Sequence, residues 1–532
     1  PELYQLVATF GLTLAMSDAM RWGFGPGEVF APRFPGLKGA VELWGEFFPV
    51  WQLVTMTLGP LVWLGLHLLL TRTRFGQRLR AATMDRAMLD ALGVNPKPLM
   101  LGAVMLGCAL AGLGGALQLP REPANLQMDV NVIVETFVVV VTGGLGSIGG
   151  AFFAALLIGL IHALGVSLFP QATLVLVFLT MAVVLAVRPQ GLMGQPLDAG
   201  PREIIQKFHQ PSVKQSWNVL YFVAFFGLCA LAWTGGEYTR SLASDALILL
   251  IFGVSLQSMM ALGGLVSFGH AAFFGLGAYG AALSHTQWGA SLPVALAAGC
   301  ALALAVAAVF GAAVVRSAGV YLAMLSLALA QVIWATATQW VALTGGDNGV
   351  IGLRLVSDDT RPLFFVLLVF IASLSVAALS RLAGSTFGAA LQAVRDTPQR
   401  AAASGLPVNG IRYRIFVESA VLAGLAGGLA AAHKGAVFPS AASVATSVDA
   451  LLVVLLGGVH QLWGAAVGSA VLTWASAELG SSVAVLRDYW RGALGVFVMA
   501  IMVLSPSGLL GLLQRMKGAR RAASPPDPGG SR

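Results

Sequence analysis

The stretch FGQRLRAATMDRAMLDALGVNP (75–96) recurs as FGAALQAVRDTPQRAAASGLPVN (387–409), and this repetition decides the fold. Phe75-Gly76 aligns with Phe387-Gly388, and Gly93 aligns with Gly405, at a shift of 312 residues. Two further blocks recur in the same order. An acidic residue stands eight positions before a Gly pair in each half, and RPQGLMG (188–194) matches SPSGLLG (505–511). Such ordered self-similarity predicts two homologous units joined head to tail.

The composition places both units in a membrane. Of the 532 residues, 57% are hydrophobic and only 10% are charged, whereas a soluble domain carries about 25% charged residues. Because a bilayer-crossing helix needs about 20 apolar residues, the sequence predicts an all-α, polytopic transmembrane helical bundle with about 16 membrane segments. The predicted segments are 3–20, 49–70, 98–118, 131–142, 150–169, 172–187, 217–234, 243–262, 265–284, 291–315, 318–343, 363–380, 413–432, 448–457, 461–481 and 492–504. Two of them (131–142 and 448–457) are too short to cross the membrane as ordinary straight helices, so we expect them to be broken helices.

Basic residues set the orientation. Lys and Arg cluster in the loops 72–97 and 381–414 and after residue 505, and such clusters face the cytoplasm. Both units then end on the same side, so the repeat is parallel, with an axis along the membrane normal. The expected organisation is a first permease unit (1–195), a cytoplasmic linker (196–216), a second permease unit (217–511) and a basic, Pro/Gly-rich cytoplasmic tail (512–532). The first unit lacks counterparts of the opening segments of the second, so we interpret it as truncated at Pro1.

The repeated loop is predicted to form a short amphipathic helix that ends at a Gly and lies at the membrane face. An isolated loop of this kind would be read as a solvated basic segment that only fixes topology. Its recurrence between the same two spans of each half instead indicates a docking element for a cytoplasmic motor. The residues assigned to this docking element are Phe75, Gly76, Arg78, Arg80, Asp85, Gly93, Phe387, Gly388, Arg395, Asp396 and Gly405.

A second set of residues is a candidate for the solute path. Gly pairs after short apolar segments indicate broken helices, which membranes tolerate only inside protein or beside a cavity. Intramembrane carboxylates suggest a functional site, although they could equally hold two helices together. The segment 264–283 and the start of the span after it add polar groups. The path candidates are Glu135, Gly143, Gly144, Ser267, His270, Tyr279, Tyr321, Asp449, Gly457 and Gly458.

Several of these motifs resemble one known family, the transmembrane subunits of ABC importers for branched-chain amino acids, with relatives for urea and short amides. The motifs are GLVSFGHAAFFGLGAY (264–279), GVYLAMLSLALAQ (319–331), TGGDNG (344–349), GGLGSIGGA (143–151), GGVHQLWGA (457–465) and the repeated FG…LxA…G loop. Residues 1–195 resemble the C-terminal two-thirds of the smaller subunit of such importers. Residues 217–511 resemble a whole larger subunit.

The resemblance implies a multi-pass protein of the bacterial cytoplasmic (inner) membrane with three kinds of partner: two cytoplasmic ABC ATPase subunits, a periplasmic solute-binding protein and the lipid bilayer. The sequence contains no G-x-x-x-x-G-K-[ST] loop, so we expect no cofactor on this chain and ATP hydrolysis by the partner subunits. The formal charge of +8 is explained by the basic cytoplasmic loops, with no nucleic acid needed. Three widely spaced cysteines indicate no metal site.

Other functions are open from the residues alone. A permease for urea or short amides would fit almost as well as one for branched-chain amino acids. An ion-coupled secondary transporter can also be built of parallel halves, but it would not need the repeated docking loop. A membrane enzyme or a channel has no supporting motif, because HExxH, GxSxG and a filter sequence are all missing from the chain.

Overall fold

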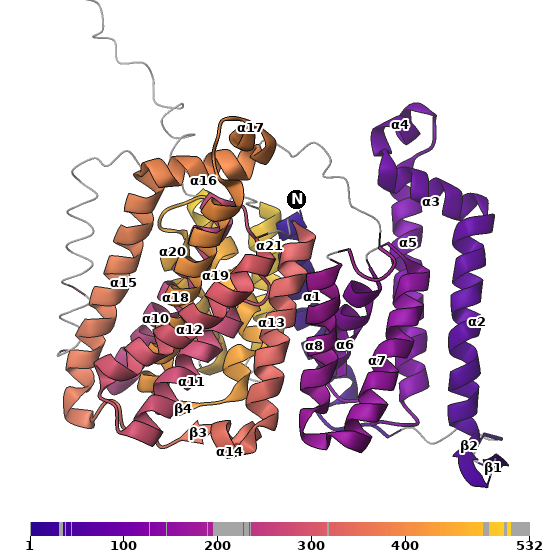
Figure 1. Ribbon diagram of the computed structural model, residues 1–532, viewed down its shortest axis with the longest axis horizontal. Helices are drawn as coiled ribbons and strands as arrows, with labels where there is room; N and C mark the ends of the chain where they lie inside the picture. The colour runs from indigo at the N-terminus through magenta and orange to yellow at the C-terminus, as the bar shows by residue number, and fades with distance from the viewer. Residues whose placement is uncertain are drawn as a thin grey trace, which may run out of the picture. The chain divides into compact units, whose positions relative to one another are not determined.

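The computed structural model describes residues 2–30, 36–37, 39–43, 45–126, 128–144, 146–188, 190–194, 227, 234, 236–315, 319–481, 489–504 and 508–511. The predicted linker 196–216 and tail 512–532, and almost all of the predicted span 217–234, lie outside these residues. The described chain is almost entirely helical (Figure 1). The predicted all-α polytopic fold is therefore confirmed.

Within the part of the chain that the structure describes, eight helices are long and apolar enough to cross a membrane. They comprise α2 (Val50–Arg72), α5 (Pro96–Gln118), α7 (Ile148–Leu168), α10 (Glu237–Gln257, extended by the π-helical η2, Ser258–Leu262), α12 (Leu292–Val314), α13 (Val320–Gln339), α15 (Arg361–Gly384) and α18 (Val408–Lys434). Helices α1 (Glu2–Phe24), α11 (Ala271–Trp288) and α20 (Gly464–Ser481) are of similar length. The shorter apolar helices are α6 (Met128–Gly143), α8 (Thr173–Val187), α19 (Val444–Gly457) and α21 (Trp490–Leu504).

Short elements connect these helices. They are α3 (Arg74–Met84), α4 (Arg86–Ala91), α14 (Val341–Thr344), α16 (Thr386–Asp396), α17 (Pro398–Ala403), η1 (Pro170–Ala172), η3 (Gly346–Asn348), η4 (Asp358–Thr360) and η5 (Pro439–Ala442). Two small antiparallel ribbons pair β1 (Ala40–Leu43) with β2 (Glu46–Pro49) and β3 (Val350–Ile351) with β4 (Ala436–Val437).

The sequence repeat is reproduced in the helix boundaries. The run α2–α3–α4–α5 reappears as α15–α16–α17–α18, and α3 and α16 begin 312 residues apart, as do α4 and α17. The series α6, α7, α8 then reappears as α19, α20, α21. The helices α10, α11 and α12 have no counterpart among the described residues of the first half.

The chain divides into two compact units. The larger unit comprises Pro1–Ala19, Ile161–Pro189 and Leu197–Arg532, and the smaller unit comprises Met20–Leu160 and Gln190–Pro196. The core of the larger unit forms where α11, α12 and α18 cross (Figure 1). Glycines at the crossings, such as Gly277 against Gly424 and Gly427 against Phe274, leave no room for a Cβ. In lipid, the hydrophobic effect does not drive helices together. Small residues stabilise the contact instead, because they let the helix backbones approach closely.

Within the larger unit, the two halves of the repeat exchange helices. Helix α1 of the first half packs on α21 of the second, where Gly11 lies against Gly495 and the backbone N–H of Gly492 donates to the Asp18 carboxylate. Helix α8 of the first half packs on α13 of the second. Since α21 is the counterpart of α8, and α1 and α13 each precede the repeated segment of their half, the two contacts are reciprocal. This arrangement fits the parallel repeat predicted from the sequence.

One predicted span is wrong at its start. Residues 265–284 were expected to be helical throughout, but the segment 264–270 is irregular and α11 begins only at Ala271. Gly264 adopts a left-handed conformation (φ +65°) that interrupts the helix. Hydroxyls from other helices then satisfy the freed backbone: Ser326 Oγ accepts from Phe268 N (3.1 Å), and Ser447 Oγ accepts from Ala271 N (2.9 Å). Irregular backbone is tolerated at membrane depth where protein groups satisfy it in this way.

Candidate functional site

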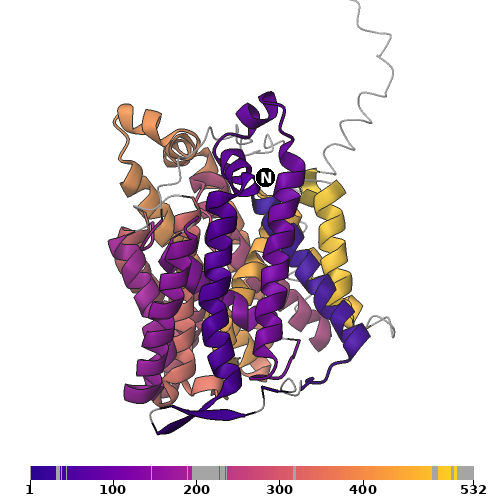
Figure 2. The ribbon, with the colours of Figure 1, turned by 90° about the vertical axis from the view of Figure 1, so that its right-hand side faces the viewer.

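The repeated loop forms two helices in each half. The prediction of a single amphipathic helix per loop is therefore wrong. Helices α3 and α4 join the ends of α2 and α5 in an elbow (Figures 1 and 2), and α16 and α17 do the same between α15 and α18. The bend falls at Asp85 and at Thr397, which share an extended backbone with φ near −146°. Asp85 also caps α4, because its carboxylate accepts from Met88 N at 2.9 Å. We call these two elements the docking elbows.

Each docking elbow is fixed at both ends by the same devices. Thr73 and Ser385 cap the first helix of their elbow by accepting from Gly76 N (3.3 Å) and Gly388 N (3.0 Å). Both glycines lie against the preceding membrane helix, so a side chain there would overlap its backbone.

The second helix of each elbow ends in a Schellman motif. The motif is centred on Gly93 (φ +80°) in one half and on Gly405 (φ +81°) in the other. The repetition of these ends means that the two elbows have the same internal shape.

The docking residues differ in exposure. Arg78, Arg80, Asp85 and Asp396 are exposed, whereas Phe75 and Phe387 are half-buried. Arg395 was assigned to the same surface, but its side chain is only 2% exposed. Its guanidinium donates to the Ala261 carbonyl in η2 and, through Nε, to Asp396 at 2.8 Å. Arg395 is therefore wrong as a surface contact; it ties the elbow to the interior of its own bundle.

The Gly pairs do break the membrane helices, as predicted. In the smaller unit, α6 ends at Gly143 and α7 begins at Ile148, while in the larger unit α19 ends at Gly457 and α20 begins at Gly464. Gly143 lies against the backbone of Gly150, and Gly457 lies against that of Gly464, with no space for a side chain at either contact. Gly144 (φ +100°) and Gly458 (φ +114°) make the following turns.

The third repeated block closes each break. Gly191 lies against the Gly144 backbone, and Leu192 N donates to Thr142 O at 2.8 Å. Gly508 lies against Gly458 in the same way. In the larger unit, the buried Gln257 adds a support that no sequence motif predicts: its Nε2 donates to Val459 O at 3.1 Å and to Gln461 O at 2.6 Å.

A cavity of about 750 Å³ lies in the larger unit, bounded by α10, α11, α18, η5, α19, α20 and the start of α21. We call it the outer cavity, because β4 and η5 beside it lie at the end of the bundle opposite α16 (Figure 1). Its wall is mostly apolar and includes Leu249, Phe252, Phe274, Val437, Phe438 and Trp490. Three charged residues also line it: Asp245, Lys434 and Asp449. This mixture of apolar wall and few polar groups is typical of small-molecule sites.

The structure separates the two predicted carboxylates. Asp449 lines the outer cavity, and it is the one path candidate named above that does so. Glu135 is exposed on α6 in the smaller unit. The remaining charged cavity residues, Asp245 in the third turn of α10 and Lys434 at the end of α18, were missed, because each is a single residue that belongs to no motif.

Two other polar path candidates, Ser267 and His270, are fully buried. His270 is fully buried, with Nε2 2.8 Å from Ser255 Oγ and 3.4 Å from Ser419 Oγ. The ring of Phe252, a cavity residue, stacks on the His270 ring at 5.6 Å. Among the described residues, His270 Nδ1 and the hydroxyl of the buried Ser267 have no hydrogen-bond partner.

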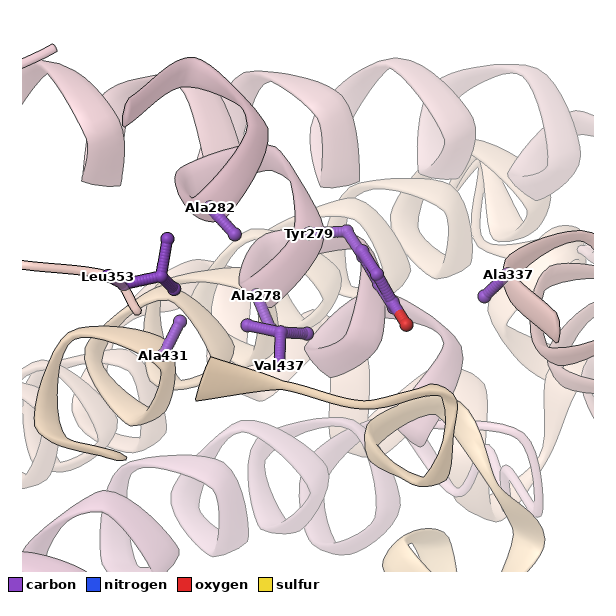
Figure 3. Close-up of a cluster of buried hydrophobic side chains, with 7 residues drawn as sticks. All are labelled: Ala278, Tyr279, Ala282, Ala337, Leu353, Ala431 and Val437. Atoms are coloured by element: carbon purple, nitrogen blue, oxygen red, sulfur yellow. The ribbon is translucent and has the colours of Figure 1, made fainter. Parts of the chain in front are cut away.

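The two tyrosines lie in other places. The side chain of Tyr279 belongs to a buried cluster of α11, α13, α18 and β4, and its hydroxyl points toward Ala337 (Figure 3). Tyr321 is half-buried in the first turn of α13. Neither tyrosine lines the outer cavity.

Comparison with known proteins covers both halves of the repeat. A family described as "Branched-chain amino acid transport system / permease component" matches residues 7–187 and 238–505. The high-affinity branched-chain amino acid transport system permease protein LivM of Escherichia coli (strain K12) is 28% identical over 367 residues, which are 63% of this chain and 84% of LivM.

Two further relatives are matched over a shorter stretch. The corresponding permease protein BraD of Pseudomonas aeruginosa is 28% identical over 201 residues, which are 37% of this chain and 65% of BraD. LivH of Escherichia coli (strain K12) is 26% identical over a stretch of the same length. No solved structure matches the chain significantly.

Proposed function

This chain belongs to the family of branched-chain amino acid transport system permease components, and from this premise we propose that it is the transmembrane permease of an ATP-driven importer for branched-chain amino acids. The observation that carries the proposal is the docking elbow, which occurs once in each half with the same caps, the same close glycine contact and the same helix ends. A channel or an ion-coupled carrier has no use for two equivalent cytoplasmic elbows.

The proposal assigns a partner to each face of this multi-pass membrane protein. Two cytoplasmic ABC ATPase subunits would each bind one docking elbow, on the side where the basic loops accumulate. A periplasmic solute-binding protein would deliver the solute to the opposite face, where the outer cavity lies. The membrane would be the bacterial cytoplasmic membrane. The sequence has no phosphate-binding loop of the Walker type, so the nucleotide would be bound and hydrolysed by the partners.

The solute class is supported by two independent features. The relatives LivM and BraD are named for branched-chain amino acid transport. The outer cavity offers apolar wall together with charges of both signs, which suits an aliphatic amino acid. Urea and short amides carry no charge, so they would make no use of those charged side chains.

The test is reconstitution of the full chain in proteoliposomes with two candidate ABC ATPase subunits and a candidate solute-binding protein from the same organism. We expect ATP-dependent uptake of L-leucine that requires the binding protein. Uptake of urea or acetamide without leucine uptake would reassign the permease to amides. Leucine uptake driven by a sodium or proton gradient in the absence of ATP would show a secondary transporter instead.

A further inference from the structure

We propose that the outer cavity is a binding site for a zwitterionic amino acid with an aliphatic side chain, in which Asp449 contacts the ammonium group and Lys434 the carboxylate. The inference rests on the proposed function, because it identifies where the larger unit first holds the solute. It goes further by naming the groups that recognise each charge of the solute.

The two charges are free to bind a ligand. Asp449 and Lys434 both line the cavity, and Asp449 lies in the positive field of Arg491 and, more weakly, of Lys434. Neither side chain takes part in any ion pair or hydrogen bond recorded for the described residues. A carboxylate and an ammonium group that face one cavity without binding each other are both available to a ligand. A zwitterion can then place its ammonium group against Asp449 and its carboxylate against Lys434.

The third charged residue of the cavity is already engaged. Asp245 Oδ1 lies 3.9 Å from His433 Nε2, and the hydroxyl of Ser241 approaches the same nitrogen at 3.4 Å. His433 in turn stacks on Phe364 at 6.4 Å. This cluster holds the second and third turns of α10 to the end of α18, so Asp245 shapes the wall beside Lys434 and is not the first candidate for the ammonium group.

An apolar surface faces these charges. Ile248, Leu249 and Phe252 come from successive turns of α10, and Phe274 of α11 packs on Phe252 at 4.7 Å. An aliphatic side chain of the ligand would remove part of this surface from water, at roughly 25 cal/mol for each Å² buried. The combination selects a ligand with a charged head and an apolar tail.

The position of the cavity fits an early step of transport. Phe252 and Phe274 form part of its wall, and the ring of Phe252 stacks on His270, which lies in a buried cluster with Ser255 and Ser419. The docking elbow is at the other end of the same unit (Figure 1). A solute held in the cavity is therefore separated from the interior by an aromatic layer.

The experiment uses the full chain in nanodiscs of phosphatidylcholine and phosphatidylglycerol and measures binding of three probes. L-Leucine carries both charges, isoamylamine lacks the carboxylate, and 4-methylpentanoate lacks the ammonium group. The variants are Asp449→Asn and Lys434→Met. The matched control is Asp359→Asn, which removes an exposed carboxylate of η4 that does not line the cavity.

We expect a specific pattern. Asp449→Asn should weaken leucine and isoamylamine about 10-fold to 100-fold, as for the loss of a charge-assisted hydrogen bond, and leave 4-methylpentanoate unchanged. Lys434→Met should weaken binding of 4-methylpentanoate and leave binding of isoamylamine unchanged. The control should bind all three like the unmodified protein. Unchanged leucine binding in both variants, or equal weakening of all probes, would overturn the site. Asp449→Glu keeps the charge and should therefore retain leucine binding. This variant distinguishes the loss of a charged contact from misfolding caused by any substitution at this position.

Two further arms separate the possible explanations. Phosphatidylethanolamine is also zwitterionic, so the series is repeated in nanodiscs that contain it; loss of leucine binding there would assign the cavity to a lipid headgroup and overturn the proposal. Leucine uptake by the complete importer that is insensitive to both substitutions would refute the site and leave the proposed function standing. Charge-specific binding without any uptake would refute the function and leave the site.

Discussion

The tie between Arg395 and η2 predicts that Arg395→Met loosens a segment on another helix. The guanidinium is buried and donates to the Ala261 carbonyl, and its stem packs against Gly264. Methionine keeps most of the stem but removes the donor, so the carbonyl loses a bond to a charged group, about 1.5–3 kcal/mol. The pair with Asp396 adds at most about 1 kcal/mol, because the Asp396 side chain is 47% exposed. Relief of the buried charge offsets part of this, which leaves roughly 2 kcal/mol.

The loss should appear locally. A change of about 2 kcal/mol corresponds to roughly 30-fold faster hydrogen exchange for amides that open with the segment. The amides to follow are those of Gly264 and Leu265, which donate to Met260 O at 3.2 Å and Met259 O at 3.3 Å. Exchange is measured by mass spectrometry on peptides that cover residues 258–270 of the full chain.

The repeat supplies a matched control. Thr83 occupies the position of Arg395 in the first half and is exposed, so Thr83→Met should leave the exchange of residues 258–270 unchanged. In the reconstituted importer, Arg395→Met should lower leucine transported per ATP hydrolysed. Unchanged exchange in Arg395→Met, or the same acceleration in Thr83→Met, would refute the tie.

Four other predictions follow from the repeated elements. Gly457→Ala places a methyl group against the carbonyl of the facing glycine in α20, so we expect the free energy of unfolding, measured by thermal unfolding, to fall by about 1–3 kcal/mol. Gly159→Ala, where space is open, should be neutral. Equal effects of the two substitutions would contradict the contact. Gly405→Ala costs about 1–2 kcal/mol from its left-handed backbone and should speed hydrogen exchange at the end of α17. Bulky residues at both Gly93 and Gly405 should reduce uptake while ATP hydrolysis continues, and unchanged uptake would contradict the docking role. Asp85→Ala removes a helix cap worth about 1 kcal/mol and should speed proteolysis within 85–92; an unchanged rate would show that the cap is dispensable.

The repeat and its breaks could be predicted because they depend on residues that leave a local trace. Phe75-Gly76 and Phe387-Gly388 recur at a fixed shift, and the helix boundaries follow that shift. The glycines at 143 and 457 recur because each contact excludes a side chain. Close backbone contact therefore becomes visible in a single sequence when it occurs twice.

Long-range contacts left no such trace. Arg395 reads as one more basic residue of a cytoplasmic loop, and only the fold shows that it reaches Ala261. The segment 264–270 is apolar enough for a helix, yet hydroxyls of Ser326 and Ser447 stabilise an irregular path. Lys434 sits at the end of a helix and reads as a cap. These features depend on partners that are distant in the chain, so neither periodicity nor motif predicts them.

The reciprocal contacts of α1 with α21 and of α8 with α13 have a consequence for assembly. Each half supplies a helix that packs on the other half, so the pairing surfaces are complementary and unlike. Within one polypeptide, the partner surfaces meet at an effective concentration on the order of millimolar. The fusion therefore fixes a one-to-one stoichiometry and disfavours pairing of a half with a second copy of itself.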